Sequence, residues 1–261
     1  MTENSSSRKI AVTGATGRVG SHVVEILEER GHSVVAIARS KGVDVISAEG
    51  LDEALTGVET IVDGATGPSP DQEAATEFFV TSARNLQRAG GAAGVKRIVV
   101  VSIIGIDKFH GGYNAAKLAQ ERTLLEGPLP VRIVRAAQFH EFVEPLVGWT
   151  IQDGVAHVPE MRTQLVAARV VAEALADAVE EPEVQNGRIT EIAGPKEERL
   201  ADAAAALFAS RGDSLEIREG RGGPLAEPDD PDAAAYAAGG ALPNPGAKLA
   251  GPSFEEWLGA A

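Results

Sequence analysis

The chain has 261 residues, 44% of them hydrophobic, and is therefore long enough to bury a full-sized core. Its 24 lysines and arginines face 38 acidic residues, and a surface with a formal net charge of −14 repels nucleic acid and anionic lipid. The absence of cysteine excludes disulfides, thiolate nucleophiles and cysteine-ligated zinc. Residues 1–9 are polar, and the longest mainly apolar run, residues 98–106, is too short to span a bilayer. We therefore expect a cytoplasmic protein with neither a nucleic-acid nor a membrane partner.

Apolar, β-branched segments alternate with helix-patterned segments through the first half of the chain, which is typical of repeated β-α-β units. We predict strands over residues 9–13, 33–38, 43–46, 58–62, 97–102 and 131–135. We predict helices over residues 18–30, 71–90 and 113–126, and the helix after the second strand is expected to be reduced or missing. The fold class is therefore predicted to be α/β: a doubly wound parallel sheet, or Rossmann fold.

Beyond residue 135 the pattern loosens. We predict one more strand over residues 188–192 and one more helix over residues 197–210. Residues 220–251 are rich in Gly, Pro, Ala and Asp, so we expect loops there with one short helix. Near the end of the chain, Phe254 and Trp257 stand at helical spacing and are expected to form an aromatic clasp. The length fits a single domain spanning residues 1–261.

The first predicted strand runs directly into a glycine-rich turn with the pattern GxxGxxG. In such a turn Gly14 permits a tight bend, Gly17 lets the backbone approach a pyrophosphate, and Gly20 lets the helix pack closely on the strand. The helix N-terminus adds free amides and the positive end of the helix dipole. Glycines that merely punctuate a strand-to-helix turn are the alternative, but a strand and a helix flank this motif. We therefore predict a dinucleotide site that includes Thr13, Gly14, Thr16, Gly17, Arg18, Val19 and Gly20.

The end of the second predicted strand bears on the choice between NAD(H) and NADP(H). An acid there would bind the ribose 2′-hydroxyl, whereas a cation would bind the 2′-phosphate. The chain has Arg39, Ser40 and Lys41 at this point, with no carboxylate until Asp44. Two cations and a hydroxyl favour NADP(H) over NAD(H), with Arg39 and Ser40 as ligands. An arginine that stacks on the adenine of either cofactor is the alternative.

Tyr113 and Lys117 stand four residues apart at the start of a predicted helix, so both project from one face. A lysine ammonium near a phenol lowers the phenol's pKa, and the same lysine can bind the nicotinamide ribose. That arrangement suits proton transfer to a carbonyl during hydride transfer. Such a pair alone is usually a solvated helix face, but here it follows a strand of a predicted nucleotide-binding sheet.

Together these motifs resemble the short-chain dehydrogenase/reductase superfamily, and within it the atypical, NmrA-like NAD(P)-binding proteins. The resemblance implies a Rossmann fold, NADP(H) on the first two motifs, Tyr113 as acid/base and Lys117 on the cofactor ribose. It also implies a substrate pocket built by a small C-terminal region, roughly residues 136–261. The segments that carry it are VTGATGRVG, AIARS, GVKRIVVVSIIGID, GYNAAKLAQE and IVRAAQFHEF, with FEEWL as a looser match.

The chain departs from this superfamily at one catalytic position. The superfamily's serine or threonine usually lies about two residues after the serine that ends the fifth strand, and Ile104 occupies that place. Ser102 is therefore the remaining catalytic hydroxyl candidate. If Ser102 lies too early to touch a substrate, the carbonyl loses one hydrogen-bond donor, and reductase chemistry becomes slow, altered or absent.

The segment after the sixth predicted strand lies where this architecture places the substrate mouth. Phe139, His140 and Phe142 are expected to shape the pocket, and His140 is either a proton donor or substrate contact, or a buried histidine satisfied by a neighbour. His110, in a glycine-rich loop before Tyr113, is a weaker candidate of the same kind.

Further predictions concern the remaining polar segments. Ala65 and Thr66, after the fourth predicted strand, are expected to line the cofactor site, with a simple proline-rich turn as the alternative. The five histidines are scattered, so no metal site is expected. Three acids are expected to form a solvated face: Glu180, Glu181 and Glu183.

The function that fits these residues best is an NADP(H)-dependent oxidoreductase that reduces a carbonyl or quinone-like group of a small organic molecule. Ile104 in place of the hydroxyl favours a second hypothesis, a non-catalytic sensor of the NADP/NADPH ratio. A third hypothesis is a redox-neutral tailoring enzyme that keeps its cofactor bound. The sequence leaves the oligomeric state open, a homo-oligomer included.

Overall fold

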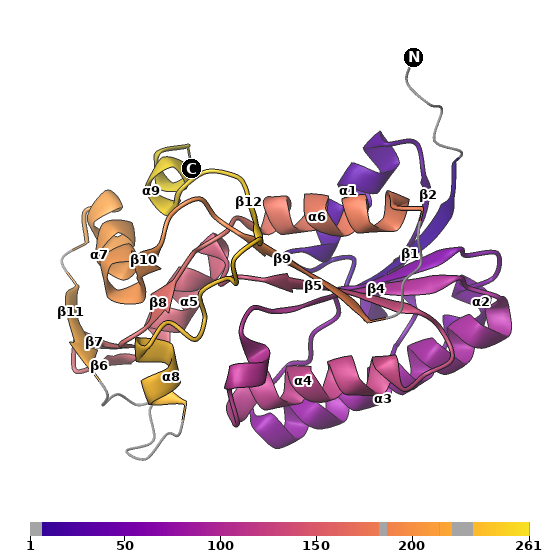
Figure 1. The fold of residues 1–261 in the computed structure, drawn as a ribbon, viewed down its shortest axis with the longest axis horizontal. Coiled ribbons are helices and arrows are strands. Elements are labelled where there is room, and N and C mark those ends of the chain that lie inside the picture. The colour runs from indigo at the N-terminus through magenta and orange to yellow at the C-terminus, as the bar shows by residue number, and fades with distance from the viewer. Residues whose placement is uncertain (1–6, 183–186, 214, 221–231, 261) are drawn as a thin grey trace. The chain divides into compact units, whose positions relative to one another are not determined.

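The structure is a computed structural model, and it describes residues 7–182, 187–213, 215–220 and 232–260 (Figure 1). The chain divides into two compact units. Unit 1 consists of the described residues of Met1–Ser102, Ala115–Val134 and Val171–Ile189. Unit 2 consists of those of Ile103–Asn114, Arg135–Val170 and Thr190–Ala261. The expectation of a single domain stays a prediction.

Among the described residues, seven strands form one sheet in the order β12-β9-β5-β4-β3-β1-β2. The strands are β1 (Lys9–Thr13), β2 (Ser33–Ile37), β3 (Thr60–Asp63), β4 (Arg97–Ile103), β5 (Val131–Ala136), β9 (Arg188–Ala193) and β12 (Lys248–Leu249). β1 pairs in parallel with both β2 and β3, β3 with β4, and β9 with β12. The predicted α/β class and its parallel sheet are therefore confirmed. Because β1 lies between β2 and β3, the direction of winding reverses at β1, and such a switch point is where open α/β sheets bind ligands.

The predicted strand over residues 43–46 is wrong. Residues 43–46 are irregular chain and turn, between a 3-10 helix, η1 (Arg39–Lys41), and the four-residue helix α2 (Leu51–Ala54). Gly42 and Gly50 have φ angles of 78° and 70°, so the chain turns twice within this stretch and has no extended run long enough to pair. Of the apolar residues within 43–46, only Val45 is buried, and Ile46 is exposed. The prediction of a reduced helix is confirmed by α2.

Helices cover both faces of the sheet in unit 1. Figure 1 shows α3 (Gln72–Ala93) and α4 (Gly112–Leu125) on one face, and α1 (Gly20–Glu29) and α6 (Ala168–Glu180) on the other. The first three follow the predicted helices within a few residues, whereas α6 was not predicted. The backbone N–H of Ala168 at its start donates to both carboxylate oxygens of Glu141, at 3.1 and 3.0 Å. The cap of α6 thus comes from 27 residues earlier, where no local sequence pattern reveals it.

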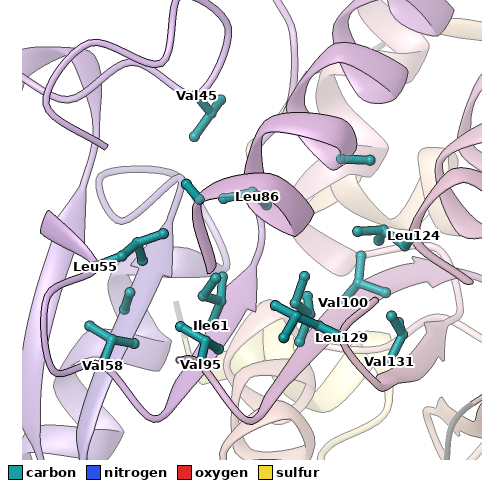
Figure 2. Close-up of a cluster of buried hydrophobic side chains, with 14 of the residues drawn as sticks. Val45, Leu55, Val58, Ile61, Leu86, Val95, Val100, Leu124, Leu129 and Val131 are labelled. Carbon is teal, nitrogen blue, oxygen red and sulfur yellow. The ribbon is translucent and has the colours of Figure 1, made fainter. Parts of the chain in front are cut away.

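The core of unit 1 lies between the sheet and the helices α3 and α4 (Figure 2). Ile61 and Val100 from the strands meet Leu86 of α3 and Leu124 of α4, and all four are fully buried. Each such side chain contributes about 1.5–3 kcal/mol of burial free energy. Among the described residues, this cluster has no buried aromatic ring, although Phe79 of α3 is also fully buried in unit 1.

The expected solvated acidic face is wrong for Glu180 and Glu181. Glu180 accepts from Arg30, at the end of α1, at 2.7 Å and lies 3.1 Å from His32 Nε2. Glu181 pairs with the guanidinium of Arg132, whose side chain is buried. Glu183 lies outside the described residues. These acids therefore fix the end of α6 against its neighbours in unit 1.

Unit 2 has its own core and its own small sheets. β6 (Ile151–Gln152), β7 (Val155–Pro159) and β11 (Glu216–Gly220) form one sheet, and β8 (Arg162–Thr163) pairs with β10 (Glu198–Arg199). Its helical elements are η2 (Ile106–Lys108), η3 (His140–Phe142), α5 (Val143–Gly148), α7 (Leu200–Ser210), α8 (Ala233–Ala237) and α9 (Phe254–Ala260). The helix α7 was predicted.

Two predictions about the C-terminal part are confirmed. The short helix expected in residues 220–251 is α8, although residues 221–231 of that stretch lie outside the described residues. The expected aromatic clasp is formed in α9, where the rings of Phe254 and Trp257 stack with their centroids 5.7 Å apart. In the ranges that the structure describes, no helix has both the length and the apolar composition needed to cross a lipid bilayer.

Candidate functional site

The glycine-rich turn connects the carboxyl end of β1 to the start of α1 in unit 1. Gly14 has a φ angle of +63°, and a Cβ at this position would lie 2.6 Å from the carbonyl oxygen of Gly64. The loop after β1 thus touches the loop after β3, and only glycine permits both the backbone angle and the approach. This confirms the tight turn predicted at Gly14. Ala65, expected at the cofactor site, is part of the same contact, since its Cα would lie 2.9 Å from that Cβ.

Gly20 begins α1 directly against this turn. A Cβ at Gly20 would lie 2.1 Å from the Gly14 carbonyl oxygen, and the Gly17 amide donates to the same oxygen at 2.8 Å. The close packing predicted for Gly20 is therefore present, and it is made against the turn. No side chain caps the start of α1 and its first turn carries no acid, so the positive end of the helix faces no carboxylate of its own. Thr16, Gly17 and Arg18 are exposed.

This turn fits a dinucleotide pyrophosphate. Gly14 and Gly20 let the turn, the loop after β3 and the start of α1 come together at backbone contact, and an anion at the start of α1 is favoured by the helix dipole. Thr16, Gly17 and Arg18 are accessible to such a ligand, whereas the side chain of Val19 is only 7% exposed. The Val19 side chain therefore packs inside the protein and is not accessible to a ligand.

Arg39 and Ser40 lie in η1, immediately after β2. Thr13 of β1 is in register with Ile37 of β2, so the two strands end side by side. The side chains of Arg39, Ser40 and Lys41 are exposed, and within the described residues neither cation has an ion-pair partner. The cations therefore stand beside the glycine turn with their charges unneutralised by the protein. Thr66, in the loop after β3, is exposed as well.

A buried polar network extends from the glycine turn to α4. Asp63, at the end of β3, accepts from the Thr13 hydroxyl at 2.5 Å and from the Ala65 amide at 3.3 Å through one oxygen. Its other oxygen accepts from the Gln120 side-chain amide at 2.8 Å, and Gln120 in turn accepts from Lys117. Thr13 is fully buried, so its side chain supports the turn and is not free for a ligand. Asp63 and Gln120 were not predicted: Gln120 lies in the segment GYNAAKLAQE, but its bond to Asp63 joins residues 57 positions apart in the sequence.

Lys117 is held firmly within unit 1. Its ammonium donates to the Val101 carbonyl oxygen at 2.8 Å and lies 4.6 Å from the centroid of the Phe79 ring. Burial lowers the pKa of Lys117 to about 8, while the carboxylates of Asp63 and Glu121 act in the opposite direction. Lys117 therefore remains mainly protonated at pH 7. Tyr113, half-buried, lies one turn earlier on the same helix.

The catalytic hydroxyl candidate is poorly placed for contact with a ligand. Ser102 is 3% exposed, and its hydroxyl has no hydrogen-bonding partner among the described residues. Ile104, at the superfamily's usual position for the hydroxyl, is also buried. The structure thus offers no exposed hydroxyl at either position.

The predicted substrate residues lie in unit 2 around η3. His140 is 1% exposed, and its ring lies 5.3 Å from that of Phe254 and 5.4 Å from that of Trp257. Burial lowers the pKa of His140 to about 4, despite the opposing influence of the Leu165 backbone, and neither ring nitrogen has a partner at hydrogen-bond geometry among the described residues. The structure therefore shows the burial expected of the second alternative, but within the described residues it does not show the neighbour that was expected to satisfy the ring.

The two phenylalanines beside His140 are more accessible. Phe139 and Phe142 are both half-buried, and the Phe142 ring lies 5.4 Å from that of Trp149 in an edge-on arrangement. In the described part of the chain, no three His, Asp or Glu side chains gather as a metal site.

The sequence was compared with models of known protein families. The model described as NAD(P)H-binding matches residues 14–182, from the glycine turn to the end of α6. The chain belongs to the NAD(P)H-binding family. This membership confirms the predicted resemblance to NmrA-like short-chain dehydrogenase/reductases.

Curated relatives of this NAD(P)H-binding protein include several oxidoreductases. Quinone oxidoreductase 2 of Escherichia coli is 27% identical over 78% of this chain and 74% of its own length. 4-Hydroxy-tetrahydrodipicolinate reductase of Natronomonas pharaonis is 30% identical over 60% of this chain and 54% of its own length. L-arabinose 1-dehydrogenase (NAD(P)(+)) of Haloferax volcanii is 32% identical over 44% of this chain and 48% of its own length. The chain thus spans only about half of the last two relatives.

Solved structures share the fold at low sequence identity. MoeE5 in complex with UDP-glucuronic acid and NAD aligns with a TM-score of 0.72 at 19% identity, covering 96% of both chains. WbmH of Bordetella bronchiseptica in complex with NAD+ aligns with a TM-score of 0.69 at 20% identity, covering 97% of both chains. These likenesses establish the Rossmann-like fold of the family.

Proposed function

We propose that this NAD(P)H-binding protein is an NADP(H)-dependent oxidoreductase that reduces a carbonyl or quinone-like group of a small organic substrate. The observation that carries the proposal is the fixed, charged Lys117 one helical turn after Tyr113, in a chain of this family. The match to Escherichia coli quinone oxidoreductase 2, which extends over most of both chains, supports the substrate class.

Residues of the glycine turn would hold the cofactor's pyrophosphate, and Arg39 with Ser40 would hold the 2′-phosphate. The preference for NADP(H) is supported by two exposed cations at the end of β2 that no described carboxylate neutralises. When bound, the reduced nicotinamide supplies a hydride to the electrophilic carbon of the substrate.

Tyr113 would donate its phenolic proton to the substrate oxygen as negative charge develops there. The ammonium of Lys117 favours the resulting phenolate, because an opposite charge nearby stabilises the ionised form. Lys117 can do this at neutral pH because its pKa of about 8 leaves it mainly protonated. Its bonds to Val101 and Gln120 prevent it from swinging away, so its charge is oriented before the reaction begins.

The test of this proposal is steady-state NADPH oxidation with a panel of ketones, aldehydes and quinones. We expect turnover with at least one class, and a fall in kcat of at least about 100-fold in Tyr113→Phe, because general acid catalysis contributes roughly 10²–10⁴-fold. The conservative exposed substitution Arg84→Lys is the control and should leave kcat unchanged. Equal turnover by Tyr113→Phe and wild type would contradict the proposed role of the phenol.

A second candidate function is a non-catalytic sensor of the NADP/NADPH ratio. The observation that favours it is the burial of Ser102, which leaves no accessible hydroxyl at the position expected to polarise a carbonyl. NADPH binding without turnover on any substrate, together with wild-type binding by Tyr113→Phe, would replace the reductase by the sensor.

A further inference from the structure

A segment far along the chain closes on the loop that leads into Tyr113. Within unit 2, the carboxylate of Asp232 accepts from the His110 amide at 2.8 and 2.9 Å and from the Gly111 amide at 2.9 Å. The same carboxylate lies 3.3 Å from Nδ1 of the His110 ring. Asp232 is only 4% exposed, whereas His110 is exposed, so the carboxylate is buried and the bonds are partly buried. The contacts join residues more than 120 positions apart.

Residues after Asp232 reinforce this attachment. The Tyr236 ring stacks on Phe109 with the centroids 4.2 Å apart, and its hydroxyl accepts from the Asn114 side chain. The carbonyl oxygen of Gly240 accepts from Lys108 at 3.3 Å. A Cβ at Gly105 would lie 2.0 Å from the same oxygen, so the two segments fit at backbone contact. We call residues 232–240 the brace.

The held loop ends where α4 begins. The two amides that Asp232 binds belong to His110 and Gly111, and α4 starts at Gly112, so the carboxylate also faces the positive end of that helix. Asn114, held by Tyr236, flanks Tyr113 on its other side. The residues before and after Tyr113 are thus both fixed by the brace, whereas Lys117 is fixed independently in unit 1.

We propose that Asp232 is a positioning residue for Tyr113: its carboxylate, with Tyr236, fixes the first turn of α4 so that the phenol is presented to the substrate at one height and angle. This inference rests on the proposed function, since it assigns the brace to the reacting tyrosine. Displacing a catalytic group by about 1 Å can cost roughly 100-fold in rate, so the loss of the brace lowers kcat without touching the cofactor turn.

The experiment compares Asp232→Ala, Asp232→Asn and Tyr236→Phe with the exposed control Asp202→Asn. For each variant, kcat, the Kd for NADPH and the hydrogen exchange of residues 108–114 are measured. We expect Asp232→Ala to lower kcat by about 10- to 100-fold with an unchanged Kd and faster exchange of the His110 and Gly111 amides. Asp232→Asn retains one acceptor oxygen and should recover part of kcat. Tyr236→Phe should keep the stacking of its ring on Phe109, and its kcat should fall less than that of Asp232→Ala.

Two results would overturn the inference: unchanged kcat and exchange in Asp232→Ala, or loss of NADPH binding in both Asp232 variants. If the wild-type protein reduces no substrate, the proposed function fails by itself. The exchange measurement then still decides whether Asp232 holds this loop.

Discussion

Gln120 shows how one buried side chain supports two charges. Its amide donates to Asp63 and its carbonyl oxygen accepts from Lys117, so Gln120→Met leaves a carboxylate and an ammonium each short of a partner. We predict a fall of about 2–3 kcal/mol in the free energy of unfolding. We also predict that the pKa of Lys117 falls further, so the alkaline limb of the kcat profile moves to lower pH. Urea denaturation and a pH–rate profile measure these effects, with the exposed Gln152→Met as control. An unchanged pH profile would contradict the network.

His140 makes the stability of the protein depend on acid. Its pKa is about 4 in the folded chain and near its usual value of 6.5 in the unfolded chain. Between pH 6.5 and 4 the unfolded state therefore binds a proton that the folded state does not, and stability falls as the pH falls. The loss reaches about 3 kcal/mol near pH 4.

The His140→Leu variant should lose this component. We predict a shallower decline of its unfolding free energy between pH 6.5 and 4 than that of wild type, measured by denaturant titration at several pH values. The control His157→Leu retains His140 and should keep the steep component. If the unfolding free energies of wild type and His140→Leu fall equally between pH 6.5 and 4, the burial of His140 does not make stability depend on pH.

At the residue scale, sequence motifs located the glycine turn, but they missed the buried side chains that support it. Gly14 and Gly20 were predictable because backbone angle and close approach admit only glycine there. Asp63, Gln120 and Asp232 were not predicted, because each has an essential partner that lies 50 or more residues away in the sequence.

At the scale of elements, the start of α1 depends on its contact with the turn. A methyl group at Gly20 would meet the Gly14 carbonyl oxygen, so Gly20→Ala must displace the turn or the helix. We predict that the free energy of unfolding falls by about 1–3 kcal/mol and that the Kd for NADPH rises at least tenfold. Calorimetry and a binding titration check both effects.

Gly91→Ala in α3 is the matched control for this substitution. Its Cβ would make an ordinary contact with Pro128 at 3.7 Å, so alanine should stabilise the helix by about 0.5–1 kcal/mol and leave NADPH binding intact. If Gly20→Ala behaves like Gly91→Ala in both measurements, the contact between turn and helix contributes neither to stability nor to NADPH binding.

Elements with strong local signals were predicted, and those with distant partners were not. The bounds of β1 agree with the prediction because its apolar run is followed directly by glycine. The segment 43–46 looked like a strand because three of its four residues are β-branched and apolar, although glycines on both sides bend the chain. The helix α6 was missed because its cap, Glu141, is remote in sequence.

At the scale of the whole molecule, the order of strands sets where a ligand can bind. Winding reverses at β1, and the loops after β1 and β3 meet there, at Gly14 and Gly64. The alternation of strands and helices predicted this architecture, because parallel strands need helical crossovers. A C-terminal region of roughly residues 136–261 was expected, but the small sheets of unit 2 were not, since they come from strands of two to five residues.

The central claim is that the glycine turn and the cations after β2 together bind NADPH. The most direct test is a titration of the purified protein with NADPH and with NADH, followed by nicotinamide fluorescence, in wild type and in Arg39→Ala. We predict that wild type binds NADPH at least tenfold more tightly than NADH, and that Arg39→Ala loses this difference while its affinity for NADH is unchanged. Equal affinity for both cofactors in wild type would contradict the assignment of the cations, and binding of neither would contradict the whole account.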